Sequence, residues 1–312
     1  MPGAYAHITL VNELKTTPTL EDIFGSLTQA ITSVLDYFKF CELGAVSPDY
    51  PYLAVLDDDA KKWADTMHYY LTGEMIKAGI RQLWDIEGET KRKLLAWLLG
   101  YSAHVAMDVT IHPVVELKVG PYQGHETEHR ICEMNQDAYI FPRLNLGEIG
   151  LSEHLDSGIG KCGSPTDANH LDPEIEQVWR AMLNDVHPAA VYMNQPDINK
   201  WHQWFKKMVD EFGEEGHRLI PLARHVAAGI GLTYPALDTI DKQYIENLQV
   251  PGRKKNYDEI FDIACTNVKT VWRLVAQGVM AEDTAYLTAI GNWNLDTGKD
   301  DKGQLAFWKA AA

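Results

Sequence analysis

The chain has 312 residues, 46% of them hydrophobic and 23% charged, so it can bury a large globular core. Its net charge of −16 argues against a surface that binds nucleic acid through basic residues. We expect neither a Sec signal nor a membrane span, because the start lacks a basic region followed by an apolar one and no window of about 18 residues is continuously apolar. The expected location is the cytoplasm, or outside the cell after export by a route that reads no N-terminal signal.

Apolar residues recur every three or four positions along most of the chain, which predicts a mainly α protein. In the first half the predicted helices are separated by proline and glycine and cover residues 20–39, 58–78, 90–111 and 126–140. A Gly-, Ser- and Asp-rich stretch from about 145 to 173 predicts a long loop. Further helices are predicted from Asp172-Pro173 onward and over 200–228, 241–248 and 258–279, with a short hairpin in the tail, 286–308.

The four cysteines form no Cys-x-x-Cys pair, so neither a thiolate zinc site nor a redox motif is indicated. Buried free thiols are favoured over disulfides in a chain of this length.

Three potential ligands share one face of the predicted helix that ends near Pro113. His104, Asp108 and His112 are four residues apart, so they spread over roughly 80° of the helix surface. Their neighbours are apolar, and an unpaired carboxylate among them would be costly unless a cation is bound. Imidazole and carboxylate without thiolate are typical of catalytic zinc sites, although hydrogen-bonded core side chains are the alternative. Because a residue before proline avoids α conformation, His112 is expected at the helix exit.

A second helix carries His129 and Glu133 at the same spacing, for which a solvated helix face is the alternative interpretation. Three more candidates precede both helices: His7, Asp49 in the turn-like Ser-Pro-Asp segment, and His68. These five segments with potential His, Asp or Glu ligands lie within 133 residues and indicate a site for more than one metal ion.

These residues follow a known order. His7, Pro48-Asp49-Tyr50, His68, the His-xxx-Asp-xxx-His-Pro segment and His129-xxx-Glu133 resemble the zinc-dependent phospholipase C family, whose fold is shared with S1/P1-type nucleases. The similarity covers roughly residues 4–137 and looks closest to the metallophospholipases C of Pseudomonas and Legionella. It implies a multi-helix fold with irregular loops, over a single domain of residues 1–312. A metal-site half (1–144) would precede a half made of a loop and helices (145–312).

The resemblance also implies a role for each ligand. One zinc ion would be held by Asp49, His68, His104 and Asp108, and a second by His112, His129 and Glu133. A third would lie between Asp108 and His7. Secreted members of the family complete the third site with an N-terminal tryptophan, whereas this chain has none near His7. We therefore expect two to three zinc ions.

The implied reaction is hydrolysis of the diacylglycerol–phosphate bond of a phospholipid at a membrane or micelle surface. Asp49 would align the attacking water in addition to binding metal. Tyr50 matches one wall of the family's headgroup pocket, but Asp65 stands where the other wall is aromatic, which tilts the expected preference toward ethanolamine or broadens it. The acidic chain would reach lipid through apolar residues of the Tyr50/Tyr52 and Gly158–Pro165 segments.

Two other functions fit the same residues. A single-strand nuclease or 3′-nucleotidase would use the same metal scaffold with an aromatic pocket for bases. A non-catalytic, metal-stabilised interaction protein would have filled coordination spheres and no turnover.

Overall fold

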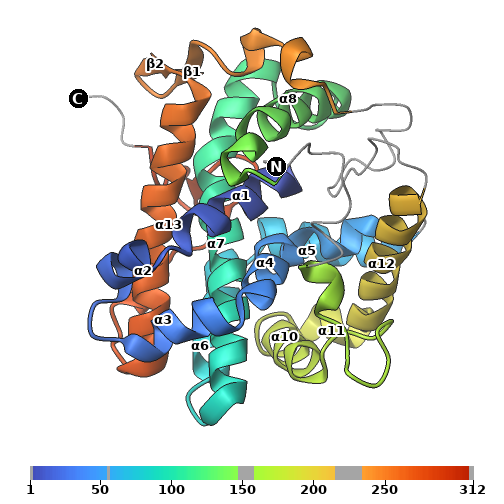
Figure 1. Ribbon diagram of the computed structural model, residues 1–312, viewed down its shortest axis with the longest axis vertical. Helices are drawn as coiled ribbons and strands as arrows, with labels where there is room; N and C mark the ends of the chain where they lie inside the picture. Colours follow the sequence, from blue (N-terminus) through green and yellow to red (C-terminus); the bar gives the residue numbers. More distant parts are fainter. Residues whose placement is uncertain (1–2, 55–56, 147–157, 215–233, 309–312) are drawn as a thin grey trace.

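A computed structural model describes residues 3–54, 57–146, 158–214 and 234–308 of the chain (Figure 1). The mainly α prediction is confirmed. The first half contains α1 (Ala4–Leu14), α2 (Thr17–Phe24), α3 (Thr28–Asp36), α4 (Phe38–Val46), η1 (Ser47–Leu53), α5 (Asp58–Tyr69), α6 (Thr72–Gln82), α7 (Gly88–Val119), α8 (Glu126–Ile140) and η2 (Phe141–Leu144). The second half contains η3 (Ile159–Lys161), α10 (Pro173–Val186), α11 (Pro188–Met193), α12 (Ile198–Glu214), η4 (Leu237–Thr239), η5 (Lys242–Tyr244), α13 (Tyr257–Met280) and α14 (Tyr286–Ala289).

The 32-residue helix α7 forms the axis of the molecule, with α4 and α13 packed along it (Figure 1). Among the described residues it is the one helix long and apolar enough to cross a membrane, but its most apolar window is completely buried inside the protein. Its apolar surface therefore forms the core. This explains why the segment lacks one polar and one apolar face: it is surrounded by other elements over most of its length.

Helices α4 and α7 cross so closely that each contributes a glycine at the contact. A Cβ atom on Gly100 would lie 2.0 Å from the carbonyl oxygen of Cys41, and one on Gly44 would lie 2.1 Å from that of Trp97. Both neighbours are backbone atoms of packed helices and cannot move aside cheaply. The close crossing brings the Ala45 carbonyl within 2.9 Å of the His104 ring, so the contact bears directly on the candidate site.

The expectation that α7 ends at His112 is wrong, because the helix continues through Pro113 to Val119. Proline leaves the carbonyl four residues earlier, that of Val109, without its helical donor. Gly298 of the C-terminal tail packs on this spot, where its Cβ would lie 2.6 Å from the Val109 oxygen. Tertiary packing against the tail therefore keeps the proline inside the helix.

Several predicted boundaries also differ. The segment 20–39 is divided among three helices, and 58–78 breaks at Leu71, which adopts a left-handed φ of 52°. The helix predicted at 241–248 is wrong: after η5 the chain forms β1 (Leu248–Val250), which pairs with β2 (Arg253–Lys255) across a turn at Gly252, φ 82°. Of the helix predicted at 200–228, α12 accounts for the part up to Glu214, and the rest lies outside the described residues.

Other expectations hold. The helix that begins after Asp172 is α10, with the Asp172 side chain accepting hydrogen bonds from the backbone of Glu174 and Ile175. The tail contains a hairpin in which β3 (Trp293–Asn294) pairs with β4 (Lys299–Asp300). All four cysteines are buried free thiols. In the predicted long loop, residues 158–172 contain η3 and a bridge between Gly163 and Leu171, and 147–157 lie outside the described residues.

The α4–α7 contact predicts the effect of Gly100→Ala. The substitution should cost about 1–3 kcal/mol of the free energy of unfolding, because the added methyl meets backbone and outweighs alanine's higher helix propensity. Urea unfolding followed by circular dichroism measures the change. Gln29→Ala, at an exposed position of α3, is the control and should alter stability by less than about 0.5 kcal/mol; equal effects for both variants would contradict the packing argument.

Candidate metal centre

Five predicted ligands come together in the interior, supplied by four different elements. His7 comes from α1, Asp49 from η1, His68 from α5, and His104 and Asp108 from α7. All five are at most 3% exposed. Within this cluster, His7, His104 and Asp108 have potential ligand atoms mutually within 4.8 Å, as do Asp49, His68 and His104. These two overlapping triads are a candidate binuclear metal site.

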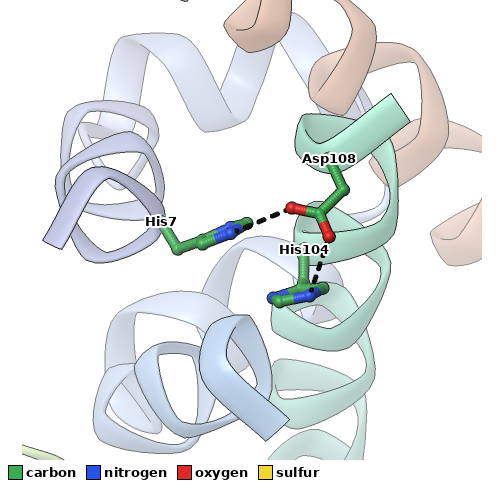
Figure 2. Close-up of side chains that lie close together, drawn as sticks. All are labelled: His7, His104 and Asp108. Carbon is green, nitrogen blue, oxygen red and sulfur yellow. Dashed lines mark ion pairs between the residues drawn. The ribbon is translucent and has the colours of Figure 1, made fainter. Parts of the chain in front are cut away.

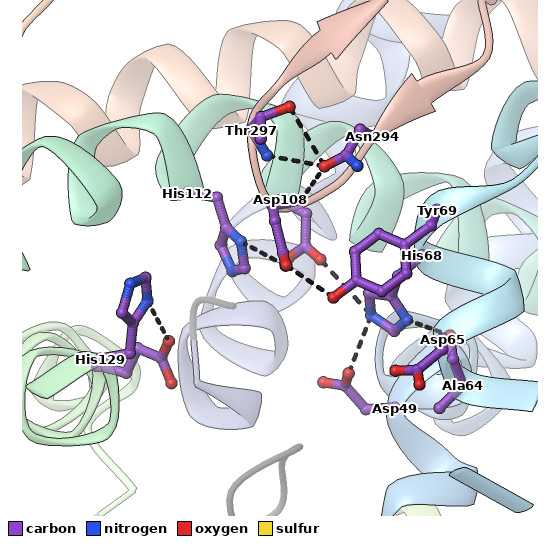
Figure 3. Close-up of polar contacts among 12 residues, drawn as sticks. Asp49, Ala64, Asp65, His68, Tyr69, Asp108, His112, His129, Asn294 and Thr297 are labelled. Atoms are coloured by element: carbon purple, nitrogen blue, oxygen red, sulfur yellow. Dashed lines mark hydrogen bonds and ion pairs between the residues drawn. The ribbon is translucent and has the colours of Figure 1, made fainter. Parts of the chain in front are cut away.

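Asp108 is the central group of the cluster. One carboxylate oxygen lies 3.2 Å from Nε2 of His7 and the other 3.3 Å from Nε2 of His104 (Figure 2). The second oxygen also lies 3.8 Å from Nε2 of His68, whose same nitrogen is 3.2 Å from Asp49 (Figure 3). A carboxylate with a histidine near each oxygen has the geometry expected of a bridging ligand.

Backbone carbonyls orient two of the imidazoles. Nδ1 of His68 donates to the carbonyl of Ala64 at 2.7 Å, and Nδ1 of His104 donates to that of Ala45 at 2.9 Å. In each ring this contact directs Nε2 at the carboxylates, and Nε2 can bind a metal ion when it carries no proton. Metal-binding histidines are characteristically held in this way.

Electrostatics show that the cluster is suited to a cation. Burial raises the pKa values of Asp49 and Asp108, but the neighbouring imidazoles, His104 first, outweigh it and hold both pKa values below their usual range. Both carboxylates are therefore ionised at neutral pH. Their oxygens are buried and make no hydrogen bond to the described residues, as is also true of Nε2 of His7. Ionised, buried acceptors without donors match the requirements of a metal ion.

His112, His129 and Glu133 form a looser second group. Nδ1 of His129 lies 3.9 Å from Glu133, while its Nε2 donates to the carbonyl of Gly120 at 2.7 Å. Burial lowers the pKa of His129 to about 4, against the opposing effect of the Glu133 carboxylate. Nε2 of His112 and Nδ1 of His129 are buried without a hydrogen-bond partner among the described residues. The three side chains thus have donor atoms available to a metal, in a more open arrangement than the first cluster.

Two carboxylates that contact the candidate site were absent from the sequence-based prediction. Asp296, from the hairpin in the tail, lies 3.4 Å from Nδ1 of His112 and accepts a hydrogen bond of 2.7 Å from the hydroxyl of Tyr69. Asp137 of α8 accepts from the backbone N–H of Ala6 at 2.9 Å and so fixes the first turn of α1, next to His7. Asp137 continues the four-residue spacing of His129 and Glu133 and could have been found from it, whereas Asp296 follows no spacing rule because its contact joins segments far apart in the sequence.

A cavity of about 450 Å³ reaches the second group at His129. Its lining includes His129 and Asp296 together with carboxylates and tyrosines: Asp65, Tyr69, Glu116, Tyr122 and Glu126. The hydroxyl of Tyr52 donates to Asp65 at 2.6 Å. Lys61 is the one lysine among the lining residues, and no arginine is among them, so the wall is mainly negative.

Tyr50, the other residue expected at the headgroup, does not line this cavity. Its side chain is 1% exposed, its ring stacks on Phe205, and its hydroxyl lies 3.1 Å from Nδ1 of His202. In this structure Tyr50 packs in the core, as does Tyr52 at 6% exposure. The expectation that these two tyrosines form an exposed lipid-binding rim is therefore wrong, because the 3₁₀ helix η1 directs them inward.

The fold and the cluster define a helical protein with a buried imidazole–carboxylate centre that could hold metal ions. A sequence profile of the family described as zinc dependent phospholipase C matches residues 6–189, and the chain belongs to that family. No curated protein and no solved structure matches the chain. The matched range contains the candidate ligands on α1, η1, α5, α7 and α8 and ends well before the tail that supplies Asp296.

The ligand geometry predicts that zinc stabilises the protein. Free zinc at about 100 times its dissociation constant should raise the free energy of unfolding by about 2.7 kcal/mol per site. Thermal unfolding with and without a chelator, together with metal analysis showing two to three zinc ions per chain, measures this. In Asp108→Asn most of the zinc-dependent gain should disappear; retention of the full gain would mean that Asp108 does not bridge.

A pH dependence follows for the metal-free protein. Burial opposes the charge on His104, but Asp108 and Asp49 outweigh it and raise its pKa to about 9. A pKa raised on folding adds stability that is complete below pH 6.5 and is lost as the pH rises through 9. We expect a loss on the order of 2 kcal/mol between pH 7 and 9 in chelator, and a smaller loss in His104→Gln. Urea unfolding at several pH values tests this; parallel curves for the two proteins would contradict it.

Proposed function

We propose that the protein is a zinc-dependent phospholipase C that hydrolyses glycerophospholipids with a cationic headgroup, phosphatidylethanolamine or phosphatidylcholine. The observation that carries the proposal is the cluster of five buried ligands with ionised, unbonded carboxylate oxygens; a cavity with an acidic wall, which reaches the second group of candidate ligands at His129, supports it. Within the family we group the chain with the metallophospholipases C of Pseudomonas and Legionella, which its sequence resembles. The products would be diacylglycerol and the phosphorylated headgroup.

The candidate ligands would have two roles in the reaction: holding the metal ions and accepting a proton. Bound zinc would supply a Lewis acid that polarises the phosphate and makes a water molecule acidic enough to attack near neutral pH. His7, His68, His104, Asp49 and Asp108 would hold the metal ions. Asp49 stays ionised, so its carboxylate can also accept the proton of the attacking water.

The cavity supports the choice of headgroup. Asp65, Glu116, Glu126 and Asp296 place carboxylates in its wall, and Tyr69 and Tyr122 add aromatic rings. An ammonium group gains from both kinds of neighbour, whereas the glycerol headgroup of phosphatidylglycerol offers no cation to pair with them. The same wall repels the phosphates of a nucleic acid strand, which disfavours the nuclease alternative.

The proposal predicts an order of substrates. In matched micelles the zinc-loaded protein should hydrolyse phosphatidylethanolamine and phosphatidylcholine at least about 10-fold faster than phosphatidylglycerol, since one charge-assisted contact contributes about 1.5 kcal/mol. Single-stranded DNA should remain intact. Phosphate-ester release, measured with and without chelator, provides the test. DNA cleavage without lipid turnover would favour the nuclease, and no turnover of any substrate would favour the interaction protein.

The variant Asp65→Asn tests whether the acidic wall of the cavity determines the headgroup preference. We expect kcat/KM for phosphatidylethanolamine to fall about 10-fold while that for phosphatidylglycerol changes little, because the variant removes one charge without touching a metal ligand. Asp58→Asn, an exposed site in the first turn of the same helix, is the matched control. An equal fall for both lipids would assign Asp65 a structural role instead.

A further inference from the structure

The C-terminal hairpin lies against the metal centre, although it is outside the range matched by the family. Its tip brings the Asp296 carboxylate to within 3.4 Å of Nδ1 of His112. The next residue back, Leu295, is completely buried and donates its backbone N–H to the carbonyl of His68 at 3.0 Å. The hairpin therefore contacts one candidate ligand from each of the two groups.

The position of Asp296 is closely determined by its own segment. The side-chain oxygen of Asn294 accepts hydrogen bonds from the backbone N–H groups of Asp296 and Thr297, both at 3.0 Å, which closes the turn around Asp296. At the base of the hairpin, the Thr72 hydroxyl donates to the carbonyl of Trp293 at 2.8 Å and accepts from its N–H at 2.9 Å. On the far side, Gly298 packs against Pro113. A loop fixed at three places can hold a carboxylate to a defined position.

The contact bears on the His112 ring. A carboxylate 3.4 Å from Nδ1 favours a proton on that nitrogen, and a neutral ring would then have its lone pair on Nε2. Nε2 of His112 is buried and has no hydrogen-bond partner among the described residues, so it is available to a metal. The side chain of Asp296 is 17% exposed and reaches the cavity, which allows the same carboxylate to meet solvent or substrate.

We propose that Asp296 is a positioning residue for the second metal site: its carboxylate sets the tautomer and orientation of His112, and the C-terminal hairpin thereby completes a centre whose ligands lie in the first half of the chain. This inference rests on the proposed function, because His112 must bind zinc for the orientation to matter. It adds a residue that the family match does not cover. The hydrogen bond from Tyr69 holds the other carboxylate oxygen and keeps Asp296 facing His112.

Removing the Asp296 carboxylate should lower the affinity for one zinc ion and leave the affinity for the others unchanged. In Asp296→Ala the zinc affinity of the site that contains His112 should fall about 10- to 100-fold, the usual range for partners of metal-binding histidines. The site of Asp49, His68 and His104 should keep its zinc. Metal analysis after dialysis against a series of competing chelator concentrations measures the affinities separately. His129→Ala should lower the affinity for the same zinc ion. The double variant Asp296→Ala/His129→Ala should lose that ion alone and keep the zinc of the other sites.

A readout that does not depend on zinc or activity is the His112 tautomer. In metal-free protein labelled with ¹⁵N-histidine, NMR should show His112 protonated at Nδ1 in the wild type and shifted toward the other tautomer in Asp296→Ala. Asp296→Asn keeps the shape and an acceptor oxygen but loses the charge, so an intermediate effect is expected. Asp301→Asn, an exposed acid in the same tail, is the matched control and should leave tautomer and zinc content unchanged.

The outcomes separate this inference from the proposed function. An unchanged tautomer and unchanged zinc affinity in Asp296→Ala would overturn the role of Asp296, whatever the lipid activity. If the wild type bound no zinc, the proposed function would fail and the inference with it. Should Asp296→Ala fold poorly by circular dichroism, Asn294→Ala retains the carboxylate and removes its support. Asn294→Ala should lower the zinc affinity of the site that contains His112 by less than Asp296→Ala does. An unchanged affinity in Asn294→Ala would also count against the proposal.

Discussion

The Asp108 carboxylate is buried completely in the middle of α7, with imidazoles beside both of its oxygens. Moving such an ion out of water costs several kcal/mol unless its charge is compensated. Protonated His104 can offset part of this cost, and metal can offset more, because no hydrogen bond from the described residues reaches either oxygen. The surrounding helices are arranged around this need. They bury the cluster and supply its candidate ligands from four different elements.

The closeness of the helices follows from the same constraint. His104 can direct Nε2 at Asp108 only if another group accepts the proton on Nδ1, and that group is the carbonyl of Ala45 on α4. The carbonyl reaches the ring because Gly44 and Gly100 let the two backbones meet. Two glycines in the core of the fold thus serve the chemistry of one imidazole, and the stability of the helix pair cannot be separated from the orientation of the ligand.

The parts of the site that could be predicted from sequence were those defined by helical spacing. His104, Asp108 and His112 on α7, and His129 and Glu133 on α8, follow from a period of 3.6 residues. The association of His7, Asp49 and His68 with them came from the order of motifs in a known family. Asp296 could not be found in either way, because a hairpin brings it to His112 from the other end of the chain. The same tail explains the continuation of α7 through Pro113, which a rule about local backbone conformation cannot anticipate.

The geometry of the tail has a consequence for biosynthesis. His7 leaves the ribosome before α7 is made and Asp296 leaves it long afterwards, although α7 faces both. During synthesis the α7 ligands can meet His7 early, but the hairpin that orients His112 arrives only after the rest of the described fold has been made. A nascent or truncated chain without the hairpin would therefore hold an incomplete second group of candidate ligands.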